Sequence, residues 1–411
     1  MDLSPASAFF ARLRPGFLRR PTAILLGLIA LGAPLALTAC SGDDDSNWND
    51  QTIEIGSIFS VTGDGAAFGP QQVKGARLAI NEINANGGVK GARLTLDQRN
   101  DGGDPAASAR AMRGLIENDN VLAVLGPTFS NSSAEAHPVA NDLKTPVLAV
   151  SNTGPGIVGD CAYPCDYIFR ASLGEATAIP ANIREYVDAD DPTTVAIVYP
   201  EGDAFGRSSA ITARRAFQSQ GVSGVSVDPV TNLGLRVIAS EDILRDAFMI
   251  TASSGDTVAL WIDRLRQSGF KGRILGGNAF NSRSTAEALG PIGKGSQSAA
   301  AWYAGNDSEE NREFIEAYQQ AYGEEPDQFA AQAYTGVELL AEAADDADLS
   351  FDNIESDRNL MVTALEQVKE DTPLGEFAFT PDHDVIQPIW IVEMNGQGGY
   401  KLVRKIPAPT G

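Results

Sequence analysis

Histidine and cysteine are scarce in this sequence of 411 residues, which holds two histidines and three cysteines. The histidines, His137 and His383, offer little for histidine-based catalysis or for a metal site built from several imidazoles. Three cysteines are too few for a four-cysteine zinc site. Much catalytic and metal chemistry is therefore disfavoured before any motif is considered, and no cofactor or metal is expected.

Basic residues are also few: 31 lysines and arginines stand against 54 aspartates and glutamates, a formal net charge of −23. Proteins that bind nucleic acid need clustered lysine and arginine to displace counterions, so no nucleic-acid partner is expected. The apolar share of 43% and the charged share of 21% are typical of a globular protein. The length leaves room for two or three domains.

A long apolar run lies near the amino terminus, from Thr22 to Ala39, and four arginines between positions 12 and 20 precede it. Its length is borderline for a membrane span, whereas a basic segment, an apolar segment and a small-residue ending favour an export signal. The sequence Leu37-Thr38-Ala39-Cys40 resembles the bacterial lipoprotein box. This resemblance implies cleavage before Cys40 and lipidation of that cysteine; the alternative is a retained membrane segment followed by a chance cysteine.

Residues 1–39 are therefore expected to be a lipoprotein signal peptide, and residues 40–51 an acidic tether. Loss of the signal would remove four arginines and one aspartate, which changes the net charge to −26. Such a charge favours solubility. The expected location is periplasmic or cell-surface, with the protein attached to a membrane through lipid on Cys40.

The other two cysteines, Cys161 and Cys165, flank a short segment that contains Pro164. Export would place them in a compartment that permits disulfides, where they could form a small staple. Two free thiols are the alternative. Redox catalysis is disfavoured, because the spacing is C-x-x-x-C and no basic residue lies between or beside the cysteines.

From residue 52 onward, short apolar runs alternate with segments whose apolar residues recur at helical spacing. This alternation predicts parallel sheets covered by helices. One series ends near Val150 and a second begins near Thr194, so the predicted fold class is α/β with two Rossmann-like lobes. Extended segments at 298–303 and 377–380 are expected to return the chain between the lobes, a geometry suited to hinge closure.

Ligands of open parallel sheets bind outside the carboxyl ends of the strands. The segment after the first predicted strand contains Gly63-x-Gly65, but Phe68 stands where the dinucleotide fingerprint requires a third glycine. A nucleotide site is therefore disfavoured. Phe68 could instead supply an apolar wall to a site, or pack in the core.

Two later strand ends, at 126–133 and 151–155, carry clusters of hydroxyl and amide side chains. Neutral donors at the positive end of a helix dipole suit a carboxylate, although plain N-capping is the alternative. No histidine, cysteine or carboxylate adjoins these serines, and no Gly-x-Ser-x-Gly occurs. Nucleophilic catalysis is therefore disfavoured, and the protein is not expected to be an enzyme.

A series of motifs, taken in order and spacing, gives a more specific resemblance. The motifs are Ile55-Gly56, Thr62-Gly63, Phe68-Gly69, Gly75-Ala76, Ala79 to Gly91, Asp104-Pro105, Leu125-Gly126-Pro127, Ser130, Pro146-Val147, Ser151-Asn152-Thr153, Phe169-Arg170, Phe205-Gly206, Gly269-Phe270-Lys271, Gly276-Gly277 and Phe314 to Asp327. Together they resemble the type I periplasmic solute-binding proteins, in the branch of the branched-chain amino-acid (leucine/isoleucine/valine) binding proteins. The resemblance covers nearly all of residues 52–400.

This resemblance implies two lobes joined by a three-crossover hinge, with the ligand in the cleft between them. The first lobe would comprise residues 52–171 and 302–375, and the second residues 172–301 and 376–411. The implied ligand-binding residues are Phe68, Ser130, Asn131, Ser151, Asn152, Thr153, Phe205, Ser254, Asn278 and Trp302. The serines and Thr153 would hold the carboxylate and ammonium of an amino acid. Trp302, or its neighbour Tyr303, could alternatively be a buried hinge aromatic.

Two positions depart from the family pattern. The family often has an acidic residue where Asn278 stands, to meet the ammonium, and a tyrosine where Phe205 stands. A buried ammonium without a counter-charge is costly, unless Glu201 or Asp203 points inward to replace it. An amide, a urea-like compound or an aromatic acid is therefore an alternative to a branched-chain or neutral amino acid.

The sequence thus predicts the substrate-binding lipoprotein of an ABC importer, which binds a small carboxylate-bearing solute by closure of two lobes. Its expected partners are the solute and the membrane permease subunits, and it is expected to be a monomer. A sensory ligand-binding module and an exported enzyme are the rival interpretations.

Overall fold

The computed structural model describes residues 48–231 and 244–409. The predicted signal peptide, Cys40 and most of the tether lie outside the described residues, as do residues 232–243. Within the described ranges, no helix is both long and apolar enough to cross a membrane.

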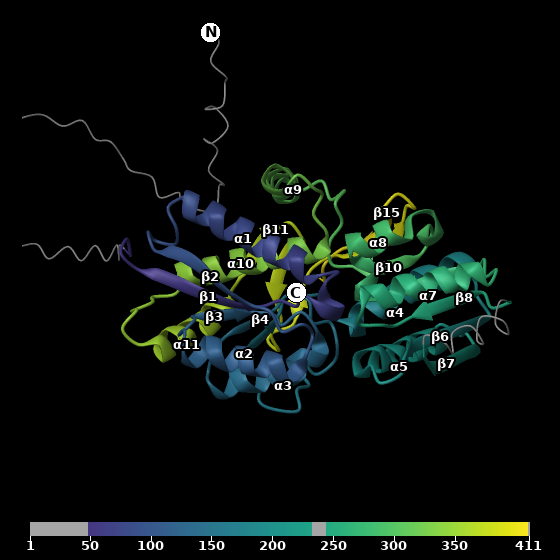
Figure 1. Ribbon diagram of the computed structural model, residues 1–411, viewed down its shortest axis with the longest axis horizontal. Helices are drawn as coiled ribbons and strands as arrows, with labels where there is room; N and C mark the ends of the chain where they lie inside the picture. Colours follow the sequence, from purple (N-terminus) through teal and green to yellow (C-terminus); the bar gives the residue numbers. More distant parts are fainter. Residues whose placement is uncertain (1–47, 232–243, 410–411) are drawn as a thin grey trace, which may run out of the picture. The chain divides into compact units, whose positions relative to one another are not determined.

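The first lobe is built on a five-stranded parallel sheet with the order β2-β1-β3-β4-β5 (Figure 1). Its strands are β1 (Thr52–Ile58), β2 (Arg93–Arg99), β3 (Ala123–Leu125), β4 (Val147–Ala149) and β5 (Ile168–Arg170). The connecting helices are α1 (Gly69–Ala85), α2 (Pro105–Glu117) and α3 (Ser130–Asp142). Strands β3 and β4 are buried throughout, which accounts for their uninterrupted apolar sequences.

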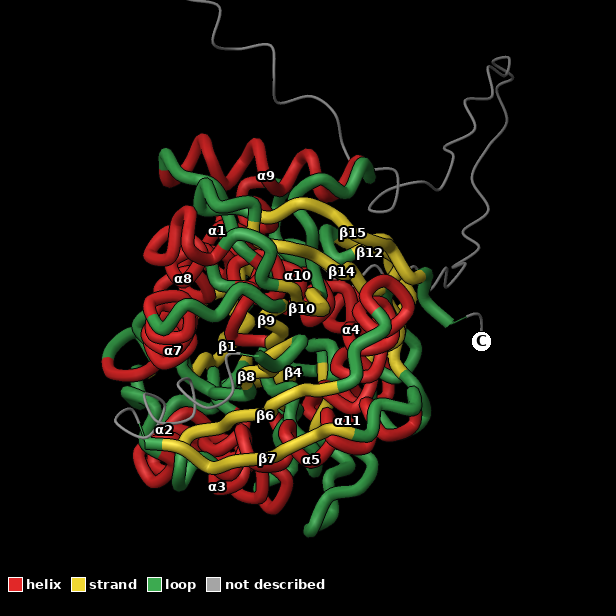
Figure 2. Tube along the Cα trace, turned by 90° about the vertical axis from the view of Figure 1, so that its right-hand side faces the viewer, coloured by secondary structure: helices red, strands yellow, loops and turns green. Residues whose placement is uncertain are grey.

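The second lobe contains a seven-stranded sheet with the order β15-β14-β10-β9-β8-β6-β7, in which β6 and β7 lie side by side at one edge (Figure 2). Its strands are β6 (Thr194–Pro200), β7 (Gly224–Val230), β8 (Ala247–Ile250), β9 (Arg273–Gly276), β10 (Gln297–Ala300), β14 (Ile389–Met394) and β15 (Tyr400–Ile406). Strands β6 to β10 are parallel, whereas β14 and β15 are antiparallel to their neighbours. Its described helices are α4 (Glu175–Asp190), α5 (Ala204–Ser219), α7 (Gly255–Gln267) and α8 (Arg283–Leu289).

The chain passes between the two sheets three times. It leaves the first after β5, leaves the second after β10, and returns to the second before β14. Between the last two crossings lie α9 (Glu309–Tyr322), α10 (Gln328–Asp346), α11 (Ile354–Leu365), β11 (Lys369–Thr372), β12 (Gly375–Phe379) and β13 (Val385–Ile386). This arrangement is of the predicted α/β class, and each lobe is made of segments that are discontinuous in the chain.

The third crossing lies further along the chain than the sequence predicts. Residues 377–380 were expected to cross between lobes, with residues 376–411 in the second lobe. Instead β12 pairs with β11 and β13, and Phe377 and Phe379 pack in the core of the first lobe, where the Phe379 ring lies 5.1 Å from that of Phe169. The crossing therefore follows β13, because the apolar face of β12 is buried with the first lobe.

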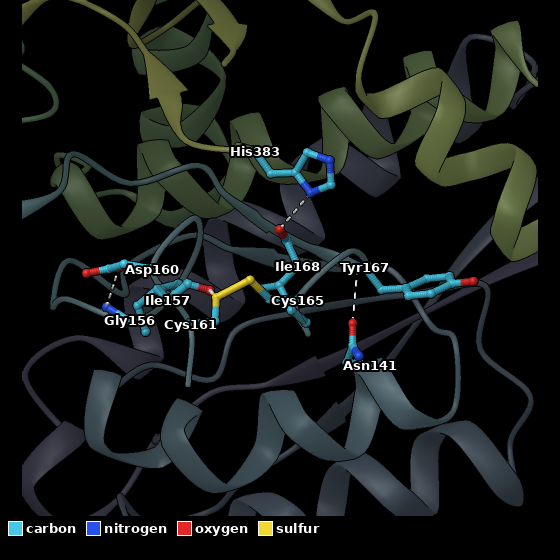
Figure 3. Close-up of a disulfide and its surroundings, with 9 residues drawn as sticks. All are labelled: Asn141, Gly156, Ile157, Asp160, Cys161, Cys165, Tyr167, Ile168 and His383. Atoms are coloured by element: carbon cyan, nitrogen blue, oxygen red, sulfur yellow. Dashed lines mark hydrogen bonds between the residues drawn. A yellow bond between two sulfur atoms is a disulfide. The ribbon is translucent and has the colours of Figure 1, made fainter. Parts of the chain in front are cut away.

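A disulfide closes the loop between β4 and β5. Cys161 and Cys165 are bonded, and the loop continues into β5, where His383 contacts the backbone oxygen of Ile168 at 3.1 Å through Nδ1 (Figure 3). The His383 ring also stacks on Phe169 with centroids 4.0 Å apart. His383 thus helps to hold the segment before β13 against the first lobe.

Helix α10 covers the first sheet and packs closely on α1. The close approach requires Gly75, because a Cβ at that position would overlap the backbone oxygen of Ala330. Gly336 on the same helix faces Val150, Leu125 and Leu148, so the strands and α10 share one core.

The Gly75→Ala substitution is expected to destabilise the protein by about 2 kcal/mol or more, because two helix backbones must separate. Gly114→Ala is the matched control, since its Cβ would meet only the Asn118 side chain at 3.9 Å. That control should gain up to about 1 kcal/mol from helix propensity. Urea unfolding of both variants measures the difference; equal effects would contradict the close packing of α1 on α10.

Candidate functional site

A cavity lies where the carboxyl ends of the two parallel sheets meet. It has an empty volume of about 320 Å³, and its walls come from both lobes. The lining residues are Phe68, Thr128, Phe129, Ser130, Ser151, Thr153, Phe205, Ala252, Ser253, Asn278, Ala279 and Phe329. We call this cavity the cleft.

Every lining side chain in the described part of the chain is uncharged. The polar ones sit in loops that follow β3, β4, β8 and β9, which is where parallel strands present a ligand site. Four phenylalanines supply the apolar walls. Phe68 contacts Phe329 with ring centroids 4.5 Å apart and Phe129 with centroids 5.9 Å apart.

The first-lobe loops are held by a continuous set of hydrogen bonds. Thr128 Oγ1 donates to Gln72 at 2.6 Å, Gln72 Nε2 donates to Ser151 Oγ at 3.0 Å, and Ser151 Oγ donates to the Thr128 backbone oxygen at 2.7 Å. The Ser151 hydroxyl proton is therefore committed to the protein. Its role in the cleft is to fix the loop, which limits what it can offer a ligand.

Two groups in the same loops remain suited to an anion. Thr153 Oγ1 is buried without a hydrogen-bond partner among the described residues. Ser130 begins α3, and the N-cap residue Phe129 offers no side-chain acceptor to the first-turn N–H groups. An unpaired hydroxyl beside the positive end of a helix dipole is a favourable place for a carboxylate.

Hydrogen bonds join the two lobes across the cleft. Asn131 Nδ2 donates to Asp203 Oδ1 at 3.2 Å, and Asn278 Nδ2 donates to the Ser151 backbone oxygen at 3.4 Å. Ser282 Oγ donates to the Ala67 backbone oxygen at 3.0 Å. The structure thus has the lobes in contact, with the cleft between them.

Two carboxylates lie just behind the cleft wall. Asp203 accepts from the backbone N–H groups of Ser253 at 3.0 Å and Gly206 at 3.1 Å, in addition to Asn131, and it caps α5. Glu201, the other candidate counter-charge, is exposed. Of Glu201 and Asp203, Asp203 is therefore the carboxylate that lies near the cleft.

Glu175, at the start of α4, is the second of these carboxylates. It accepts from the Asn278 backbone N–H at 3.4 Å and from the Ser209 hydroxyl, and it is almost completely buried. Burial raises the pKa of Glu175 to about 8, with a further upward contribution from Asp203, while the Asn278 N–H lowers it. Near neutral pH the side chain is mostly a neutral acid that ties α4, α5 and Asn278 together.

The structure brings six of the ten predicted ligand-binding residues to the cleft: Phe68, Ser130, Ser151, Thr153, Phe205 and Asn278. The other four lie elsewhere. Asn131 bridges the lobes, Ser254 caps α7, and Asn152 is buried with neither amide atom bonded within the described residues. Trp302 donates to Asn311 Oδ1 at 2.6 Å, packs on Phe314 and lines a different cavity.

Sequence reasoning missed some lining residues and the buried acid Glu175. Thr128 and Phe129 lie inside the predicted cluster 126–133, so that cluster already pointed to them. Phe329 lies in the first turn of α10, far along the chain from the strands, and no local pattern marks it. Among the described residues, no group of three or more histidine, cysteine, aspartate or glutamate side chains could hold a metal ion.

The raised pKa of Glu175 predicts a pH-dependent stability. Because the folded acid holds its proton up to about pH 8 and an unfolded glutamate releases it near pH 4.5, stability should fall as pH rises between those values. Glu175→Gln imitates the neutral acid and should remove this component, so it should be more stable than the parent at pH 8 and similar at pH 4.5. Urea unfolding at both pH values measures it; identical pH slopes would count against a buried neutral acid.

Known proteins resemble this chain in sequence and in fold. A family model described as periplasmic binding protein matches residues 52–399. The leucine-, isoleucine-, valine-, threonine- and alanine-binding protein of Pseudomonas aeruginosa is 24% identical over 363 residues, which cover 87% of this chain and 94% of that protein.

Two solved structures share the fold. The branched-chain amino acid transporter substrate-binding protein LivJ of Streptococcus pneumoniae, in complex with isoleucine, is 23% identical with a TM-score of 0.76 and covers 87% of this chain and 100% of its own. A solute-binding protein of an ABC transporter from R. palustris, in complex with benzoate, is 17% identical with a TM-score of 0.76 and covers 88% and 98%. The family resemblance and the two-lobed α/β class predicted from the motifs are confirmed: the chain belongs to the periplasmic binding protein family.

Proposed function

We propose that this protein is the exported substrate-binding component of an ABC importer, and that it captures a small carboxylate-bearing solute in the cleft. The observation that carries the proposal is the unpaired Thr153 hydroxyl, which lines the same uncharged cavity as the uncapped start of α3; the two loops meet where the Gly154 N–H donates to Ser130 Oγ at 3.1 Å. Membership of a family of binding proteins, rather than of enzymes, supports it.

Capture would begin on the first lobe. The carboxylate would accept from Thr153 Oγ1, from Ser130 Oγ and from first-turn N–H groups of α3, while Phe68 packs against the rest of the solute. The second lobe then brings Phe205, Ser253 and Asn278 over it. Closure excludes water, which strengthens these polar contacts, and the ligand must bind the closed form more tightly to drive it.

A neutral amino acid, of branched-chain type, is the proposed solute. Relatives named for leucine, isoleucine and valine support this class. The ammonium would lie toward Asp203, which accepts from the backbone N–H of the cleft residue Ser253 and is less deeply buried than Glu175.

An aromatic monocarboxylate is the second candidate. Four phenylalanine rings line the cleft, and no lining side chain of the described chain carries a charge. Such a site meets the needs of a carboxylate with an apolar ring and no ammonium, and the benzoate complex of a protein with this fold gives an example. Neither solute is expected to be altered, since release follows opening of the lobes.

The cellular setting is proposed from the sequence. The signal resemblance of residues 1–39 supports export and a lipid on Cys40, and the closed lobes would present both their surfaces to permease subunits. The protein would act as a monomer.

Leucine and benzoate, with the other amino acids, amides and organic acids of a broad panel, test the proposal directly. A true ligand at 100 times its dissociation constant should stabilise the protein by about 2.7 kcal/mol, measured by thermal unfolding. Thr153→Ala should weaken binding about tenfold or more, because a hydrogen bond to a charged group is lost. Thr363→Ala, an exposed threonine on α11, is the control. Absence of stabilisation by every compound would refute the proposal.

Asp203→Asn separates the two solute classes. Asparagine keeps an oxygen to cap α5, so the helix should remain intact while the negative charge is lost. If the solute is an amino acid, calorimetric titration should show leucine binding weakened about tenfold or more, because the ammonium loses its counter-charge. Benzoate binding should be unchanged or tighter. Unaltered leucine binding would show that Asp203 is not the counter-charge, and the exposed Glu201→Gln serves as the control.

A further inference from the structure

A second and larger cavity lies beside the crossover that follows β10. Its empty volume is about 950 Å³, and it shares no lining residue with the cleft. The walls come from the crossover residues 302–304, the loop before α10, the start of α8 and the hairpin between β14 and β15. We call it the hinge cavity, since first-lobe and second-lobe segments meet in it.

Aromatic rings form much of its apolar surface. Trp302, Tyr303 and Tyr400 line it, and two of them have their polar atoms bonded to the protein. Trp302 Nε1 donates to Asn311, and Tyr400 Oη contacts the backbone oxygens of Phe280 at 2.6 Å and Ser282 at 2.9 Å. The rings themselves are therefore what these residues present to the open space.

The charges around the hinge cavity are mainly negative. Glu287, Glu325 and Asp327 line it together with one cation, Arg283. That guanidinium is already engaged, because Nε donates to Glu287 Oε1 at 2.6 Å and Nη1 donates to the Glu325 backbone oxygen at 2.8 Å. With Arg283 paired to Glu287, the carboxylates of Glu325 and Asp327 leave the lining with an excess of negative charge, so a cation is favoured over an anion.

Gln328 lies between the hinge cavity and the cleft. Its Oε1 accepts from the Ala301 backbone N–H at 2.7 Å, and its Nε2 donates to Asn278 Oδ1 at 2.7 Å. Gln328 lines the hinge cavity and Asn278 lines the cleft, so this hydrogen bond joins the walls of the two spaces. The hinge cavity is thus separate from the proposed solute site.

We propose that the hinge cavity is a second ligand site, which takes a small aromatic molecule that is neutral or positively charged. Three aromatic rings would pack against the ligand ring, and the surplus of carboxylates would select against acids. This selection is opposite to that of the cleft, where an uncapped helix start favours a carboxylate. The inference does not depend on the proposed transport function.

Three phenols that differ in charge test the site: tyramine, p-cresol and 4-hydroxyphenylacetate. Calorimetric titration of the protein should show one saturable site for tyramine and for p-cresol at concentrations up to about 10 mM, with tyramine the tighter of the two. Ala304→Trp, at an exposed rim position, fills the cavity and should weaken the binding of tyramine and of p-cresol about tenfold or more. Ala321→Trp, an exposed alanine on α9 that does not line the cavity, should leave both unchanged.

A charge reversal tests the selection. Glu325→Lys should weaken the binding of tyramine roughly threefold, which is the size of a partly exposed charge interaction. The binding of p-cresol should be unchanged. If Ala304→Trp does not fold, Gln397→Trp fills the cavity from the opposite hairpin. No saturable binding of either phenol, or equal binding by Ala304→Trp and Ala321→Trp, would overturn the site. The charge selection would be overturned if Glu325→Lys bound tyramine as tightly as the parent protein does. It would also be overturned if the parent bound 4-hydroxyphenylacetate and Ala304→Trp abolished that binding.

Discussion

The direction of the parallel strands determines where every polar group of the cleft lies. Strands β1, β3 and β4 of one sheet and β6, β8 and β9 of the other all point their carboxyl ends toward the same space. The loops that follow must supply the first turns of helices, whose N–H groups lack partners within the helix. A cleft built in this way attracts negative charge without any basic side chain, which agrees with the scarcity of lysine and arginine.

The polar groups behind the cleft are as informative as those in it. Glu175 and Asp203 both bond to backbone N–H groups of cleft loops, yet they differ in burial. Burial keeps Glu175 mostly neutral, so it acts as a structural hydrogen-bonding group, whereas half-buried Asp203 joins the lobes through Asn131. The second lobe therefore places the more accessible of these two carboxylates at the interface between the lobes.

The sequence predicted the parts of the site that are local in the chain. Ser130, Ser151 and Thr153 follow buried strands and could be identified from that position alone, and the two-lobed α/β class followed from the alternation of apolar patterns. Phe329 and the environment of Trp302 depend on where α9 and α10 return in space, which periodicity does not reveal. The last lobe boundary was mispredicted for the same reason. The extended pattern of β12 fits either lobe, and only its packing against Phe169 shows that it belongs to the first.

Three crossings also constrain the order in which the protein can be assembled. All five strands of the first-lobe sheet have been synthesised once residue 170 is added, but the helix that covers the sheet, α10, begins only at Gln328. Leu125, Leu148 and Val150 therefore have no cover until Gly336 has been made and packs on them. A nascent chain that has made only its first half exposes that apolar face. Contacts between segments so distant in sequence form slowly, and the open face favours aggregation meanwhile. The discontinuous lobe thus leaves the growing chain prone to aggregation until most of it has emerged.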